Sequence, residues 1–138
     1  MGTRAEDLKK RTTMFALRIL KLFRALPNCP EARVIGNQLL RSGTSVAANY
    51  RAACRARSRR EFVFKLGIVE EEADETVFWL EFLSDTGLVA PGRLVNLISE
   101  GKELTAIFVA SRRTAKKNNR QLAIGNRQSR KATRNDRS

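Results

Sequence analysis

Basic side chains gather in one short stretch of the chain, and their chemistry is that of anion binding. Six of them lie between residues 51 and 65: Arg51, Arg55, Arg57, Arg59, Arg60 and Lys65. Guanidinium groups donate paired hydrogen bonds to phosphate oxygens, and the free amides at a helix start can add to such a site. Two interpretations of this basic joint stay open, a solvated connection between helices and a phosphate site.

The net charge of the chain extends the same argument beyond the joint. The net charge is +13, and residues 112–138 alone carry ten basic side chains and one acidic one. A balance of this kind favours polyanions such as RNA, DNA or an acidic membrane surface. We therefore predict nucleic-acid contacts, RNA before DNA, from the joint and from five further residues: Arg41, Arg112, Arg113, Lys116 and Lys117.

A run of carboxylates follows the joint and raises the question of a metal site. Its members are Glu70, Glu71, Glu72, Asp74, Glu75 and Glu81. Metal sites in helical bundles usually pair glutamate with histidine, and this chain has no histidine. We expect instead a wet acidic face, partly paired with arginines of a neighbouring helix or subunit. Without an acid–base pair or metal ligands, a nuclease or other enzyme is not expected, and neither is a cofactor.

The two cysteines and the distribution of apolar residues indicate the cellular compartment. Cys29 and Cys54 are too few for a zinc pattern or a disulfide framework, so both are expected to be reduced packing residues. No run approaches 18 apolar residues, and the first residues lack the apolar core of a signal peptide. We therefore expect a cytoplasmic protein that does not enter a membrane.

Four helices are needed to position these groups, at about residues 6–26, 31–55, 58–86 and 91–113. The third has the clearest pattern, with apolar spacings of 4, 3, 4, 3, 4 and 3. Ser58 and Glu61 form a capping-box sequence at its start, and Gly87 suits a left-handed cap at its end. The residues of this seam are Phe62, Leu66, Val69, Ala73, Thr76, Leu80 and Leu83.

Two further features predict close packing and self-association. Gly43 in the second helix costs about 1 kcal/mol relative to alanine, so a close packing partner should compensate. Asn49 lies in the seam of that helix, either fixing register or facing water at the rim. A second apolar stripe on the third helix predicts burial against two neighbours, more than one bundle supplies. That stripe consists of Phe64, Ile68, Phe78 and Phe82.

The chain divides into two parts of different character. Residues 1–113 carry the helical patterns and form one predicted domain. Residues 114–138 are polar and basic, with one short apolar island at residues 122–124. Such a segment cannot bury enough apolar surface to offset chain entropy, so we predict a tail that is disordered when free.

With these residues in view, the chain resembles the family of four-helix bundle proteins over Arg11–Arg113. Members of that family include proteins encoded within intervening sequences of large-subunit ribosomal RNA genes and an accessory protein of diversity-generating retroelements. Relatives often have proline at the position of Ala47 and glycine near Ala53, and the long basic tail is not general. The motifs that carry the resemblance are Gln38–Arg41, Ser45–Asn49, Arg57–Phe62 and Lys65–Glu75.

The resemblance implies an all-α, antiparallel, up-down-up-down four-helix bundle and a ring of subunits, typically a pentamer. It also implies two kinds of function. One is a nucleic-acid-binding ring, because the retroelement member is a basic barrel that binds nucleic acid. The other is a protein-binding scaffold or accessory subunit, for example for a reverse transcriptase. The joint and the tail favour the first, and the stripe with the acidic run favours the second.

Overall fold

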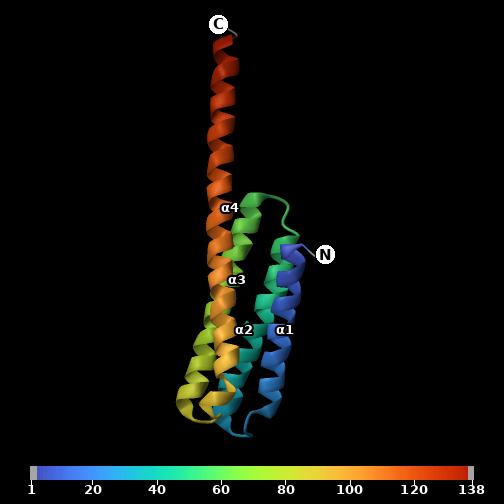
Figure 1. Ribbon diagram of the computed structural model, residues 1–138, viewed down its shortest axis with the longest axis vertical. Coiled ribbons are helices and arrows are strands. Elements are labelled where there is room, and N and C mark those ends of the chain that lie inside the picture. The colour runs from blue at the N-terminus through green and yellow to red at the C-terminus, as the bar shows by residue number, and fades with distance from the viewer. Residues whose placement is uncertain (1–2, 137–138) are drawn as a thin grey trace.

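The computed structural model describes residues 3–136, which form four long helices and one short 3-10 turn. Successive long helices run in opposite directions within one bundle (Figure 1). The all-α, antiparallel four-helix bundle is therefore confirmed. The elements are α1 (Arg4–Ala25), α2 (Pro30–Cys54), α3 (Arg59–Thr86), η1 (Pro91–Arg93) and α4 (Val95–Asp136).

The predicted ends of α3 are confirmed, with one local difference. The Ser58 hydroxyl accepts a hydrogen bond from the Glu61 amide at 3.1 Å. The Glu61 carboxylate in turn accepts from the Arg57 amide at 3.4 Å, one residue before the amide that a capping box uses. Gly87 closes the helix in the left-handed region at φ 72°, where a side chain would be strained.

The core is built from the seam of α3 and the helices beside it. Every seam residue is buried except Phe62, which is half-buried. α3 packs against α2 and α4, and α1 packs against α2 and, less extensively, against α4. Tyr50 of α2 and Phe108 of α4 close the core near the joint, with ring centroids 5.5 Å apart. The bundle therefore has α1 and α3 on opposite corners.

Glycines in α2 allow α1 to approach closely, as predicted for Gly43. A Cβ added at Gly43 would lie 3.0 Å from both γ carbons of Ile19, which is fully buried in α1. A Cβ at Gly36 would meet Leu26 at 2.7 Å. The low helix propensity of these positions is thus offset by tight contact between α1 and α2.

A bidentate ion pair ties α1 to α4 across their looser interface. Arg11 donates from Nε to one oxygen of Glu100 at 3.0 Å and from a terminal nitrogen to the other oxygen at 2.6 Å. The same guanidinium contacts Glu103 at 3.0 Å. The hydrogen bond to Glu100 is the main cause that raises the pKa of Arg11.

The C-terminal segment differs from the expectation of disorder. α4 does not end near residue 113 but continues to Asp136, well beyond the bundle (Figure 1). No proline follows Pro91, and lysine and arginine, which favour helix, are together the most frequent residues of the segment. Residues 120–134 of this segment are exposed throughout. Residues 137 and 138 of the predicted tail lie outside the described range.

None of the described helices combines the length and the apolar character that crossing a membrane requires.

Candidate nucleic-acid interface

The joint between α2 and α3 holds its arginines outward on an ordered backbone. The Arg55 amide donates to the Ala52 carbonyl at 3.1 Å, which ends α2, and Ser58 then caps α3. Three residues separate the cap of α2 from the first residue of α3, so the arginines on both sides lie close together. The exposed side chains of this surface are Arg51, Arg55, Arg57, Arg59 and Arg60.

These five guanidinium groups have no ion-pair partner within the described residues. The joint contains one carboxylate, Glu61. It forms an ion pair with Lys65 at 3.2 Å and accepts a hydrogen bond from the Arg57 amide. The hydrogen bond from Lys65 is the main cause that lowers the pKa of Glu61, with the Arg57 amide second. Lys65 is therefore neutralised in place, while the arginines keep their charge available to an anion.

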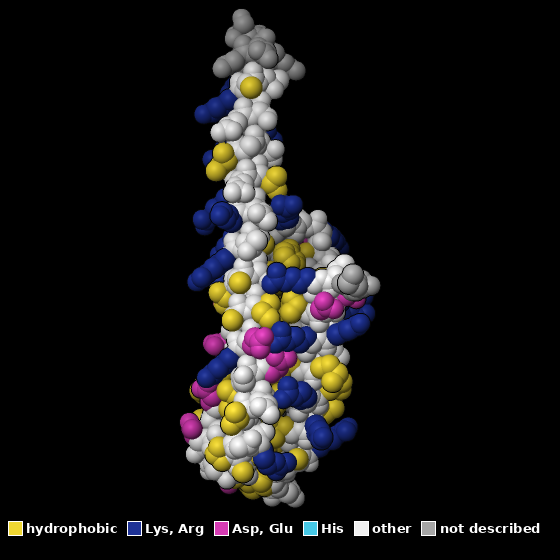
Figure 2. Space-filling view, in the orientation of Figure 1, with side chains coloured by type: hydrophobic (Ala, Val, Ile, Leu, Met, Phe, Trp, Pro, Cys, Tyr) yellow, Lys and Arg dark blue, Asp and Glu magenta, His cyan; other side chains and the backbone are white. Residues whose placement is uncertain are grey.

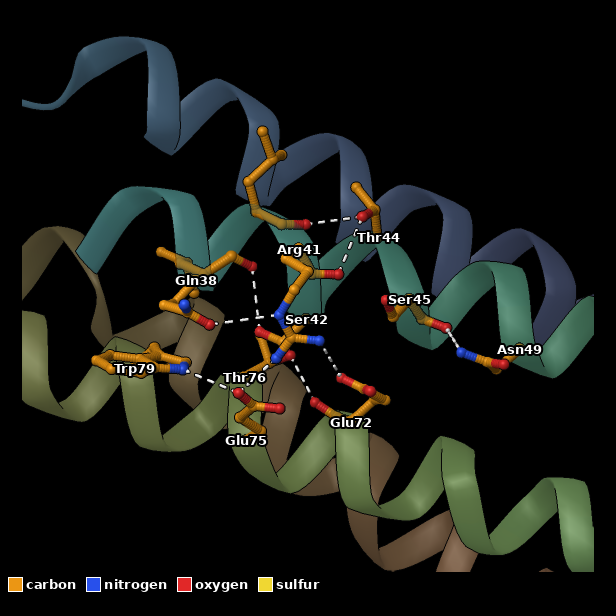
Figure 3. Close-up of polar contacts among 12 residues, drawn as sticks. Gln38, Arg41, Ser42, Thr44, Ser45, Asn49, Glu72, Glu75, Thr76 and Trp79 are labelled. Carbon is orange, nitrogen blue, oxygen red and sulfur yellow. Dashed lines mark hydrogen bonds and ion pairs between the residues drawn. The ribbon is translucent and has the colours of Figure 1, made fainter. Parts of the chain in front are cut away.

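Two other predicted contact residues are also engaged by carboxylates. Arg41 of α2 donates to Glu72 at 3.4 Å and to Glu75 by a shorter bond, as Figure 3 shows. Arg112 of α4 donates from Nε to Glu70 at 2.7 Å. The acidic run of α3 thus pairs with arginines of both neighbouring helices, as the sequence suggested. These contacts leave Arg41 and Arg112 less able to reach a ligand than the joint arginines.

The bundle brings the start of the basic tail to the joint. The N-terminus, the joint and the exit of α4 lie at the same end of the molecule (Figure 1). One groove there is lined by Arg57, Arg59 and Phe62, and a second joins Phe62 to Thr114 of α4. Arg113, Lys116 and Lys117 are exposed on that part of α4. Basic residues more than fifty positions apart therefore lie at one end of the molecule, which we call the joint end.

Sequence reasoning missed some basic residues because their significance depends on the arrangement of helices. Arg4 lines the groove at the joint end beside Thr114, a position that only antiparallel packing of α1 reveals. At the opposite end, a groove between α1 and α4 is lined by Arg18, Lys21 and Arg93. The sequence alone places Arg18 and Lys21 on the polar side of α1, but it does not show that they lie near Arg93.

The second stripe of α3 lies on the surface of the single chain. The exposed fractions of Phe64, Phe78 and Phe82 are 70%, 54% and 44%, and Ile68 is half-buried. Phe78 and Phe82 stack with ring centroids 5.9 Å apart. The surplus apolar surface predicted for α3 is thus present and uncovered in one bundle.

Asn49 does not contact another helix through a side-chain hydrogen bond in the described part. Its side-chain nitrogen donates to the Ser45 carbonyl at 2.9 Å within α2, as Figure 3 shows, and the residue is half-buried. This geometry is that of a residue at the rim of the core. A role in the register between subunits stays a prediction.

The chemistry available at the joint end is that of binding. Among residues 3–136, no three histidine, cysteine, aspartate or glutamate side chains are placed to hold a metal ion. Cys29 and Cys54 are free and half-buried. The surface offers guanidinium and ammonium groups, which fit phosphate oxygens along a polyanion.

Comparison with known proteins identifies a family and solved structures that resemble this chain. The family described as 23S rRNA-intervening sequence protein matches residues 5–110. One solved structure is that of a Bacteroides thetaiotaomicron protein of unknown function from the S23 ribosomal protein family. Its sequence is 33% identical to this chain, and the two structures superpose with a TM-score of 0.74. The match covers 80% of this chain and 99% of that one. No curated protein matches the chain.

Proposed function

The chain belongs to the 23S rRNA-intervening sequence protein family, and on this premise we propose that it is a non-enzymatic, homo-oligomeric protein that binds RNA. The contact surface is the joint end, repeated in each subunit of a ring, typically a pentamer. The family name refers to ribosomal RNA, and neither the family nor the solved relative indicates an enzyme.

The observation that carries the proposal is the contrast among the arginines. Arg41 and Arg112 are matched to carboxylates, whereas Arg55, Arg59 and Arg60 have none within the described residues. Arg59 and Arg60 lie in the first turn of α3, where a positive charge costs about 0.3–1 kcal/mol. These arginines destabilise the isolated helix. Bound phosphates would remove that cost, because they would neutralise the arginines and interact favourably with the positive end of the helix dipole.

A ring of subunits would repeat the joint end and so strengthen RNA binding without any new kind of contact. Five copies of the joint end would meet one RNA molecule at several points, and the second and later contacts would be intramolecular. The exposed stripe of α3 supports association, because large apolar patches are uncommon on monomers. α1 lies on the opposite corner of the bundle and exposes Met14 and Leu17, a second apolar surface for a neighbouring subunit.

The test of RNA binding is the salt dependence of affinity combined with charge reversal. Binding of labelled RNA should weaken steeply and linearly on logarithmic axes as salt rises. Arg55→Glu with Arg59→Glu should lower affinity by at least tenfold and leave helicity by circular dichroism unchanged. The matched control, Lys21→Glu with Arg93→Glu, makes the same charge change at the opposite end and should have a smaller effect.

A flat salt curve, or no binding at low salt, would contradict the proposal. Equal loss in the two double variants would mean that net charge matters and the joint end does not.

A second candidate function is a protein-binding scaffold or accessory subunit, for example for a reverse transcriptase. It is favoured by the aromatic stripe beside the acidic run, where Trp79 and Glu75 lie next to exposed Phe78. Pull-down from native cells with and without RNase separates the candidates. Partners that remain after RNase treatment support the scaffold, and partners that disappear support RNA bridging.

A further inference from the structure

The C-terminal part of α4 extends past the bundle as an exposed helix. Its first turns, from Thr114 to Asn118, still border the groove at the joint end, and its side chains are exposed throughout from Arg120 to Arg134. Figure 2 shows lysine and arginine side chains along this segment, whereas the acidic side chains visible in that view lie on the bundle. A solvent-exposed helix of this length has to obtain its stability and its role from something other than the core.

The basic residues of this segment fall on one face of the helix. Starting from Arg113, a row of positions recurs at intervals of 4, 3, 4, 3, 4 and 3, and Ile124 is its only uncharged member. At 3.6 residues per turn, the row together with Lys116 occupies an arc of about 100°. The basic residues of the row beyond the bundle are Lys117, Arg120, Arg127, Lys131 and Arg134.

Between residues 114 and 134 the remaining faces are neutral apart from Arg130, which lies just outside the row, and Asp136 follows on the opposite side. Asn118, Leu122, Gly125 and Ser129 fall on the side opposite the row. Like charges three and four residues apart repel one another and destabilise an isolated helix. A line of anions against the basic face would remove that repulsion, whereas charges spread evenly around the helix could not meet one line of anions.

The row begins at the joint end, on the side of α4 that faces away from the groove, and runs in a fixed direction. Thr114, the residue after Arg113, lines the groove with Phe62 at that end, and α4 then points away from the bundle (Figure 1). From Arg113 to Arg134 the helix extends about 32 Å. The bundle thereby sets the direction of a straight row of positive charge.

We propose that residues 114–134 form a helical arm that lies along an RNA duplex with its basic face on the phosphate backbone. This inference rests on the proposed function and specifies the form of RNA. No aromatic residue follows Phe108, so the arm cannot stack unpaired bases as single-strand binders do. A duplex holds its phosphates at fixed, regular spacings, and a rigid row of cations can contact them where the backbone crosses the row.

The experiment uses full-length protein and rearranges the arm without changing its composition. In the first variant three basic residues exchange places with adjacent asparagines, so that composition and net charge are unchanged and the row is dispersed around the helix. The exchanges are Lys117→Asn with Asn118→Lys, Arg120→Asn with Asn119→Arg, and Arg127→Asn with Asn126→Arg. A second variant, Ala123→Pro, keeps every charge and breaks the helix in the middle of the arm.

Affinity for a blunt RNA duplex longer than the arm should fall at least several-fold in both variants. The slope of log affinity against log salt should become shallower by about 0.9 for each lost phosphate contact. Affinity for a single strand of the same sequence should change less.

If either variant binds the duplex as the natural chain does, with the same slope, the arm acts without a fixed helical face and the inference is wrong. Equal losses on duplex and single strand would also overturn it. These outcomes differ from failure of the proposed function, in which the natural chain itself would bind neither RNA at low salt.

Discussion

Whether an arginine of this protein can meet a ligand depends on its carboxylate neighbours more than on its place in the sequence. Arg41 is half-exposed, yet Glu72 and Glu75 both accept from it. The hydrogen bond from Arg41 is the main cause that lowers the pKa of Glu75, and the same bond raises the pKa of Arg41. Arg59 has Glu61 only two residues away in the sequence, but no carboxylate of the described chain forms an ion pair with it.

This contrast predicts a pH-dependent stability effect at Glu75. Its pKa is lower in the folded protein, so its contribution is present above the ordinary glutamate pKa of 4.5 and is lost as pH falls through the folded value. Glu75→Gln should therefore reduce the free energy of unfolding by roughly 0.2–1 kcal/mol at neutral pH, because both partners are substantially exposed. In strong acid the variant and the natural chain should agree.

Urea denaturation at both pH values measures this difference. Glu71→Gln is the matched control, since Glu71 is exposed on the same helix and has no ion pair within residues 3–136. A loss of stability at Glu75→Gln that persists in strong acid would show that the ion pair is not its cause.

At the scale of the element, the α1–α2 interface depends on the absence of a side chain. Gly43→Ala should improve helix propensity by about 1 kcal/mol. The added Cβ would nevertheless lie 3.0 Å from buried atoms of Ile19, and overpacking typically costs about 1–3 kcal/mol. We expect net destabilisation, measured as a lower midpoint of thermal unfolding.

A glycine with space around it is the control for this effect. A Cβ at Gly67 of α3 would meet only Arg112, at an ordinary 3.7 Å, so Gly67→Ala should stabilise the bundle. Combined with Ile19→Ala, the Gly43→Ala change should cost less than it does alone, because the obstructing γ carbons are gone. Additive effects in that double variant would contradict the packing explanation.

At the scale of the whole molecule, the surface of α3 decides whether copies associate. If Phe78 is covered in an oligomer, Phe78→Glu buries an unpaired charge at the interface and should convert the oligomer to smaller species. Light scattering of purified protein at micromolar concentration measures the mass. Leu122→Glu changes an equally exposed apolar residue on the arm and should leave the mass unchanged.

A natural chain that is already a monomer under these conditions would contradict the oligomer proposal. Dissociation by Leu122→Glu as well would move the interface from α3 to the arm.

Several elements could be predicted from the sequence because their causes are local. The apolar period of α3, its Ser58 cap and Gly87 all act within a few residues, and each lies where it was expected. The continuation of α4 past residue 113 could not be predicted, because the composition of that segment is compatible both with disorder and with a helix that packs against nothing. The sequence indicated that Gly43 requires a close packing partner, but only the packed bundle identifies Ile19 as that partner.

The sequence by itself determined the four helices, the sign of the charge, and the presence of more apolar surface on α3 than one bundle covers. Only the tertiary structure decided which cations are matched, as in Arg11 with Glu100, 89 residues away. It also decided that residues 51–60 and 113–117 share one end. The reason is that helical period and capping depend on near neighbours, whereas ion pairing between helices depends on their rotation and register after packing.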